Sequence, residues 1–141
     1  MPEGQRPRPQ PTPETMHFWE GTRAGELRLQ RCNGCGAWRW PARAICNRCH
    51  SFAAEWVAVS GLGTITSWIR THQAFMRAFQ DDVPYAVIQV QLDEQDDIQI
   101  IGRLADPTLE PVIGMRVRAG FAPAGGDPPL VVWSLVDNTA E

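Results

Sequence analysis

The four cysteines are the residues of this chain whose type and spacing indicate chemistry. They form two Cys-x-x-Cys pairs separated by ten residues: Cys32, Cys35, Cys46 and Cys49. Two such pairs, brought together by a hairpin, place four sulfurs at the corners of the tetrahedron that Zn²⁺ accepts. Iron fits the same cage; two disulfides are the alternative, but the paired spacing favours a metal. Because four thiolates leave no water position on the metal, we expect a structural site.

Residues 26–54 must bring the two pairs together, and we expect them to form a zinc ribbon. Its first strand is predicted by the alternating apolar and polar residues 27–31. A ribbon of this size is too small to bury a stabilising core, so the metal must supply free energy of folding.

Upstream of the ribbon, we expect an extended or disordered leader over residues 1–13, which are rich in proline, and a helical segment over residues 14–25. The helix carries Phe18 and Trp19, and one face of a short helix cannot bury two adjacent side chains. Either both pack between the helix and the neighbouring domain, or one stays exposed and docks on a partner.

Downstream, residues 55–137 carry the alternating and β-branched patterns of strands, and we expect a five-stranded OB-fold barrel there. A β-sandwich is the alternative, but it usually has about seven strands. Residues 51–60 are expected to contain a connecting strand, and the apolar run at the end predicts a strand covered on both faces. The fold class is therefore mainly β, with a tail at residues 138–141. The five expected barrel strands span residues 63–71, 85–92, 98–104, 115–121 and 130–136.

Charge is distributed unevenly along the chain. Residues 1–50 hold eight Arg and four acidic residues, residues 51–141 hold five Arg and twelve acidic residues, and lysine is absent. An acidic barrel argues against a nucleic-acid groove, because phosphate contacts need clustered positive charge. No run approaches the roughly 18 apolar residues of a membrane-spanning helix, and the first residues lack the apolar core of a secretory signal. We therefore expect a cytoplasmic protein without a membrane or nucleic-acid partner.

No catalytic residues can be assigned from the sequence. The three histidines, His17, His50 and His72, lack a recognisable nucleophile or carboxylate partner. Residues 72–84 form a predicted loop that carries three large apolar side chains, which suggests either a flap over the barrel mouth or a docking surface. We favour docking. The three side chains are Phe75, Met76 and Phe79.

Taken in order, several segments of the chain resemble a family of zinc-ribbon/OB-fold proteins encoded alongside thiolases in acyl-CoA metabolism. The resemblance covers residues 14–136 and includes all four cysteines. Its segments are FWEG, GELRLQRCNGCG, WPARAICNRC, GTITSW, PYAVIQVQLDE, IIGRL and IGMRVRAGF. It implies an N-terminal helical segment, a rubredoxin-like ribbon and an OB-fold, and complexes with thiolase-like enzymes.

One branch of the family forms the small subunit of steroid side-chain aldolases. The chain lacks the hydratase-like domain of fused members, which implies a free-standing subunit.

The resemblance also implies a CoA thioester as a possible ligand. Arg39 and Arg43 are then the candidates for contacts with its phosphates, because guanidinium matches phosphate geometry. Trp40, or its neighbour Trp38, is the candidate for stacking on adenine. The alternative is that the Trp side chains pack the ribbon against the barrel while the Arg side chains are solvated.

The leading hypothesis is a non-catalytic accessory subunit of a thiolase-fold acyl-CoA enzyme. The resemblance favours a retro-aldolase that cleaves a β-hydroxyacyl-CoA such as a steroid side-chain thioester, in a heterotetramer of two plus two chains. A stand-alone acyl-CoA-binding module is the alternative. A single-strand nucleic-acid binder is a third possibility, which the acidic barrel disfavours.

Overall fold

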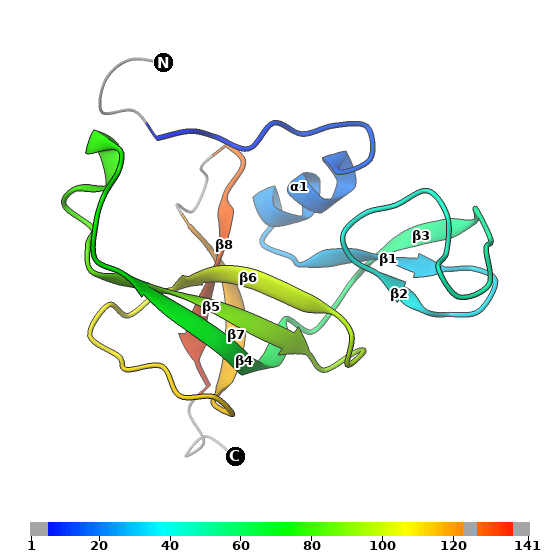
Figure 1. The fold of residues 1–141 in the computed structure, drawn as a ribbon. Helices are drawn as coiled ribbons and strands as arrows, with labels where there is room; N and C mark the ends of the chain where they lie inside the picture. The colour runs from blue at the N-terminus through cyan, green and yellow to red at the C-terminus, as the bar shows by residue number, and fades with distance from the viewer. Residues whose placement is uncertain (1–5, 123–126, 137–141) are drawn as a thin grey trace.

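A three-stranded antiparallel sheet carries the cysteines (Figure 1). The structure, a computed structural model, describes residues 6–122 and 127–136. Strand β1 (Arg28–Cys32) lies at the centre of this sheet, between β2 (Trp38–Arg39) and β3 (Ala54–Ala58). The central strand thus ends at the first metal-binding cysteine, which couples the ribbon's hydrogen bonding to the cage.

Strand β3 corrects one expectation from the sequence. We had predicted a connecting strand within residues 51–60, but β3 pairs with β1 along its whole length, from Ala54 opposite Cys32 to Ala58 opposite Arg28. Alternation within a strand cannot show which sheet the strand joins. The Val59 N–H still donates to the Leu27 carbonyl at 2.8 Å, so the chain leaves the ribbon for the barrel only after this residue.

The five strands after the ribbon form a closed barrel, as expected for an OB-fold. The strand order is β4-β5-β6-β8-β7, and pairing between β4 and β7 closes the barrel. Strands β6 and β8 run parallel, and the other neighbours run antiparallel. The strands span β4 (Leu62–Thr71), β5 (Tyr85–Leu92), β6 (Gln99–Leu104), β7 (Arg116–Ala122) and β8 (Leu130–Leu135). Within the described residues, α-helix is confined to α1 (Met16–Arg23), and a short 3-10 helix, η1 (Arg77–Phe79), lies between β4 and β5.

A tryptophan fills the barrel opposite a glycine. The side chain of Trp133 on β8 is 0% exposed. It lies over Gly102 on β6, where an added Cβ would stand 2.7 Å from the Val131 carbonyl oxygen and 2.8 Å from the Trp133 Nε1. Gly102 therefore provides the space that the indole occupies.

The exposure of β8 corrects a second expectation. We had predicted a strand covered on both faces, but Leu130 and Leu135 are 47% and 48% exposed, and Trp133 is the one fully buried residue of β8. The strand pairs with β6 at two positions and with β7 at six. Both ends of β8 therefore meet solvent, and the strand is fully covered only at Trp133.

The ribbon and α1 share one apolar core with the barrel. Phe18 of α1 is 4% exposed and contacts the rings of Trp19 and Trp40, each at a centroid distance of 4.8 Å. Trp19 and Trp40 are half-buried and pack against the same cluster as barrel residues such as Ile100. Both helix aromatics thus pack inside the molecule, which was one of the two interpretations left open.

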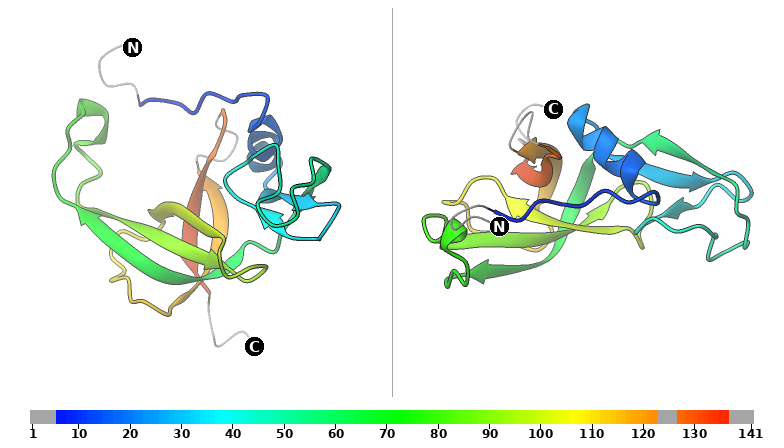
Figure 2. Two further views of the ribbon diagram at one scale, coloured as in Figure 1. Left: turned by 45° about the vertical axis from the view of Figure 1, so that its right-hand side comes forward. Right: turned by 90° about the horizontal axis from the view of Figure 1, so that it is seen from above.

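The N-terminal leader crosses the molecule above this core. In both views of Figure 2, it runs from the η1 end of the barrel to α1, which lies with the ribbon on the other side. No helix in the described part of the chain is long and apolar enough to cross a membrane.

We expect Gly102→Ala to lower the free energy of unfolding by about 1–3 kcal/mol, because the new methyl group must displace the Trp133 indole or the β8 backbone. Denaturant unfolding measures this loss. Gly120→Ala is the matched control, since the nearest atom to its added Cβ lies at 3.7 Å, and its effect should stay within about 0.5 kcal/mol. Equal midpoints for the two variants would contradict the packing described here.

Candidate metal centre

The four cysteine sulfurs gather at the end of the ribbon sheet. All four Sγ atoms lie within 4.8 Å of one another, with 3.5 Å between Cys32 and Cys49 and 3.7 Å between Cys35 and Cys46. A zinc ion with four bonds of about 2.3 Å to sulfur requires sulfur–sulfur distances of about 3.8 Å. The cysteines are free thiols rather than disulfides. Their type and spacing fit a tetrahedral metal.

The two Cys-x-x-Cys turns direct backbone donors at the sulfurs. The Gly34 N–H donates to Cys32 Sγ at 3.3 Å, and the Arg48 N–H donates to Cys46 Sγ at 3.4 Å. A thiolate accepts such bonds better than a thiol does. The turns are therefore built for sulfurs that carry negative charge.

Two residues permit the tight path of these turns. Gly36 and His50 close the first and second turn with positive φ angles of 77° and 63°. Gly34 serves a different purpose, because a Cβ at this position would lie 3.1 Å from the Cys49 sulfur. Gly36 thus admits the backbone conformation of the first turn, and Gly34 admits the close approach of the fourth ligand.

The pKa values of two of the thiols shift in opposite directions, because four thiols lie close together. Backbone N–H groups of Cys35 and Gly34 lower the pKa of Cys32 to about 6 against the effect of burial. The Ser51 N–H lowers the pKa of Cys49, but the adjacent thiols and burial outweigh it and raise that pKa to about 11. Like charges at this spacing cannot all form without a cation. A divalent metal would supply that cation and hold all four thiolates.

Arg39 lies beneath the cage and is 1% exposed. Its Nη1 and Nη2 atoms donate to four backbone carbonyls, those of Arg43 (3.2 Å), Ala44 (3.5 Å), Ser51 (2.9 Å) and Ala53 (3.5 Å). The guanidinium therefore joins the two loops that flank the second Cys pair. This position leaves no guanidinium surface for a phosphate, so the geometry disfavours the CoA contact that the resemblance had suggested for Arg39.

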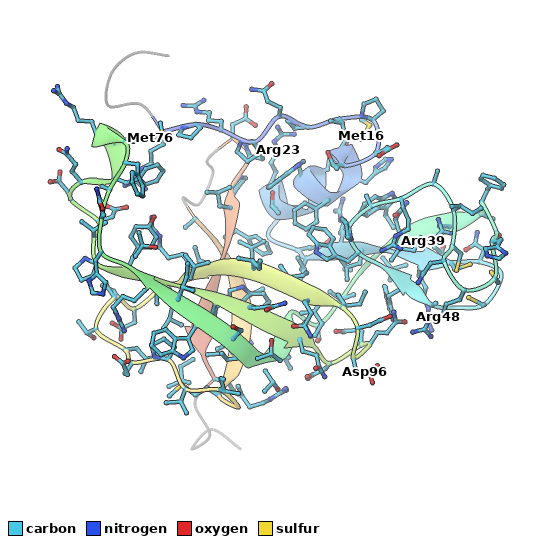
Figure 3. The ribbon with its side chains drawn as sticks, viewed as in Figure 1. Met16, Arg23, Arg39, Arg48, Met76 and Asp96 are labelled. Atoms are coloured by element: carbon cyan, nitrogen blue, oxygen red, sulfur yellow. The ribbon has the colours of Figure 1, made fainter. Side chains whose placement is uncertain are left out.

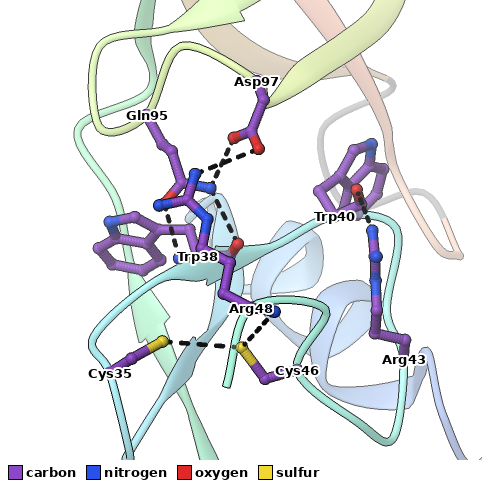
Figure 4. Close-up of polar contacts among 8 residues, drawn as sticks. All are labelled: Cys35, Trp38, Trp40, Arg43, Cys46, Arg48, Gln95 and Asp97. Carbon is purple, nitrogen blue, oxygen red and sulfur yellow. Dashed lines mark hydrogen bonds and ion pairs between the residues drawn. The ribbon is translucent and has the colours of Figure 1, made fainter. Parts of the chain in front are cut away.

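Arg43 and Trp40 have different surroundings. The half-buried Arg43 donates from Nη2 to the Trp40 carbonyl at 3.0 Å (Figure 4) and from Nε to the Pro41 carbonyl at 3.4 Å. The Trp40 ring packs at a tilted angle of 47° against Phe18 and lines a cavity next to the barrel. The two side chains therefore do not converge on one site in this conformation.

The turn between β5 and β6 fixes the ribbon to the barrel. The Gln95 side-chain amide accepts from the Trp38 N–H and donates to the Trp38 carbonyl, both at 3.0 Å. Arg48 of the second Cys-x-x-Cys turn pairs with Asp97 at 3.3 Å (Figure 4), and Figure 3 shows Arg48 on the side of the ribbon next to Asp96 of the β5–β6 turn. This turn carries four acidic residues, Asp93, Glu94, Asp96 and Asp97. Its contacts join residues 57 positions apart, a relation that no local pattern reveals.

Two small units joined by these contacts define the class of this molecule: a zinc ribbon followed by an OB-fold barrel. Family comparison agrees, since the ChsH2 rubredoxin-like zinc ribbon domain matches residues 19–55 and the ChsH2 C-terminal OB-fold domain matches residues 56–122. The chain therefore belongs to the ChsH2 family of zinc-ribbon and OB-fold proteins.

Three curated relatives share this region. The chain is 34% identical over 116 residues to the 3-oxo-4,17-pregnadiene-20-carboxyl-CoA hydratase alpha subunit of Mycobacterium tuberculosis, covering 81% of this chain and 35% of that protein. It is 33% identical over 93 residues to a probable enoyl-CoA hydratase alpha subunit of Thermomonospora curvata, covering 66% and 28%. A DUF35 domain-containing scaffold protein of Methanocaldococcus jannaschii is also 33% identical, with 64% of each chain covered. This chain thus spans about a third of the length of the two hydratase subunits.

Among solved structures, a chain of the Ltp2-ChsH2(DUF35) aldolase superposes with a TM-score of 0.79 at 28% identity. The superposition covers 91% of this chain and 98% of that one. The similarity therefore includes both the ribbon and the barrel.

We expect the purified protein to contain one zinc per chain, and Cys46→Ser to lose it, because three sulfurs and a hydroxyl bind zinc far more weakly than four thiolates. Elemental analysis of protein prepared without chelator measures the metal. Ser51→Ala keeps all four sulfurs and should retain the zinc. Parent protein without stoichiometric metal would refute the site.

Arg39→Met keeps the length and apolar stem of the side chain but removes the charge-assisted bonds to the loop carbonyls. We expect a loss of at least about 2 kcal/mol of ribbon stability, seen as faster zinc release to a chromogenic chelator. Arg43→Met is the control, since the Arg43 side chain is partly exposed and donates only to the carbonyls of Trp40 and Pro41 in its own loop. Similar release rates for both variants would show that Arg39 does not support the cage.

Proposed function

We propose that this chain is a non-catalytic accessory subunit of a thiolase-fold enzyme that acts on acyl-CoA. The observation that carries the proposal is the similarity over nearly the whole chain to the ChsH2(DUF35) component of an aldolase. The relatives named as hydratase alpha subunits and as a scaffold protein add support, since each name describes a component of a larger assembly or a support for one.

The described residues contain no assembled nucleophile and base. His17 pairs with Glu20 at 3.3 Å on the helix surface, and no histidine in residues 6–122 or 127–136 hydrogen-bonds to a hydroxyl or a thiol. The cysteines belong to the cage. The acid–base chemistry would therefore come from the partner, while this chain shapes or stabilises the partner's active site.

The partner would bury the apolar side chains that this chain leaves exposed. Phe75 and Met76, which precede η1, are 89% and 39% exposed. Phe18 is already buried in the shared core, so the helix contributes less to docking than the sequence suggested. Aromatic anchors near an interface centre commonly contribute most of its affinity. We propose a heterotetramer of two plus two chains.

The finer assignment is a retro-aldolase that cleaves a β-hydroxyacyl-CoA, such as a steroid side-chain thioester. It is supported by the aldolase whose component superposes on this chain and by the steroid carboxyl-CoA in the name of one relative. A reduced four-cysteine cage suits the cytoplasm, where we place the complex.

A stand-alone acyl-CoA-binding module remains the alternative function. The position of Trp40 on the wall of a cavity favours it. Arg43 does not line that cavity, so its contact with a phosphate would lie outside it. In that case the isolated chain would bind acyl-CoA tightly without a partner enzyme.

Co-expression with a thiolase-like protein encoded beside it tests the accessory role. We expect the two chains to elute together and to cleave a β-hydroxyacyl-CoA, and we expect the double substitution Phe75→Ala and Met76→Ala to weaken the complex by about 30-fold or more. Phe52→Ala is the control, because Phe52 is also strongly exposed, at 75%, but follows the second Cys pair in the ribbon. Separate elution at micromolar concentration with unchanged turnover would refute the proposal.

A further inference from the structure

A large cavity lies between the leader, α1 and the barrel. Its volume is about 880 Å³, within the range of roughly 300–1,000 Å³ typical of small-molecule sites. The leader, α1 and η1 surround it, and β6 and β8 contribute barrel residues, which agrees with the arrangement in Figures 1 and 2. Strands β6 and β8 pair at only two positions, Arg103 with Val132 and Leu104 with Trp133. Residues 100–102 of β6 and 130–131 of β8, which precede these pairs, are not paired with each other, and they line the cavity.

The walls of the cavity are mostly apolar. Trp19 and Trp40 come from the helix and the ribbon, Ile100 and Ile101 from β6, and Leu130 from β8. Of these, Ile101 and Leu130 are 66% and 47% exposed. Such walls favour an apolar chain or ring system, since burying it removes apolar area from water.

Cations line the same cavity. Arg6 and Arg103 both bind the Asp82 carboxylate, at 2.5 Å and 2.7 Å, and stack over Phe79 and Tyr85 respectively. Arg8 also lines the cavity, and its guanidinium has no hydrogen bond or ion pair to any residue that the structure describes. Among the described residues, the one acidic residue that lines the cavity, Asp127, is already paired with Arg23. The polar group that this lining best accommodates is therefore an anion.

We infer that this cavity binds an amphipathic organic anion, an apolar chain or ring system with a single carboxylate or sulfonate, with Arg8 as the contact for the anionic group. The Arg6–Asp82–Arg103 cluster holds the leader over the bound molecule. The site is formed by this chain alone and does not depend on the partner enzyme. A test of this inference is therefore independent of a test of the accessory role.

The test uses the whole zinc-loaded chain and two probes, 8-anilinonaphthalene-1-sulfonate and decanoate. We expect saturable binding of the sulfonate, displacement by decanoate, and at least about tenfold weaker displacement by decanol, which lacks the charge. In spectra of ¹⁵N-labelled tryptophan, the indole signals of Trp19 and Trp40 should shift, while Trp68, which does not line the cavity, should not.

Two substitutions locate the contact. Arg8→Gln should weaken decanoate binding about tenfold or more, and Leu130→Glu should weaken it by placing a negative charge in a half-exposed wall. Arg118→Gln, an exposed arginine of β7 away from the cavity, is the control and should bind as the parent does. Equal displacement by decanol and decanoate, unchanged binding by Arg8→Gln, or shifts confined to Trp68 would each overturn the inference. Tight binding of CoA itself without an apolar chain would also overturn it.

Discussion

The repulsion among four closely spaced thiolates is the constraint on which the ribbon depends. Sulfurs 3.5–3.7 Å apart cannot all ionise unless a cation lies among them. Part of the compensation is built into the chain, through backbone N–H groups that face the sulfurs and through the buried guanidinium of Arg39. The metal supplies the rest. Because Arg39 also bonds to the loops that carry the second Cys pair, the electrostatic balance of the cage and the path of the backbone are set by the same side chain.

The ribbon is coupled to the helix and the barrel because all three pack into one apolar core. Leu29 of β1 is 0% exposed and belongs to the same buried cluster as Phe18 of the helix and Ile100 of the barrel. Neither small unit would bury this surface alone. The two-way hydrogen bonds of Gln95 with Trp38 then fix the orientation of the ribbon against the barrel. The cavity next to the barrel exists because these contacts hold α1 and Trp40 at a set distance from β6 and β8.

The parts of this fold that could be predicted are those encoded over short distances. The spacing of the cysteines predicts the cage, and alternation predicts β5 with its bounds at Tyr85 and Leu92. The errors concern relations between distant segments. Nothing within residues 51–60 shows that β3 pairs with β1, and an apolar run cannot show that β8 leaves half of its surface uncovered. Arg39 was taken for a surface cation for the same reason, because its four carbonyl acceptors come from loops that only the folded ribbon brings together.

The uneven distribution of charge along the sequence also has an intramolecular explanation. Arginines of the N-terminal half pair with acidic residues of the C-terminal half, as in Arg6–Asp82, Arg23–Asp127 and Arg48–Asp97. Exposed pairs of this kind each contribute only about 0–1 kcal/mol, so they orient the leader, the helix and the ribbon more than they stabilise them. Many of the arginines of the N-terminal half are thus already paired within the chain. Recognition of a large partner must then depend on exposed apolar side chains, and recognition of a small anion on the few cations, such as Arg8, that the fold leaves without an acidic neighbour among the described residues.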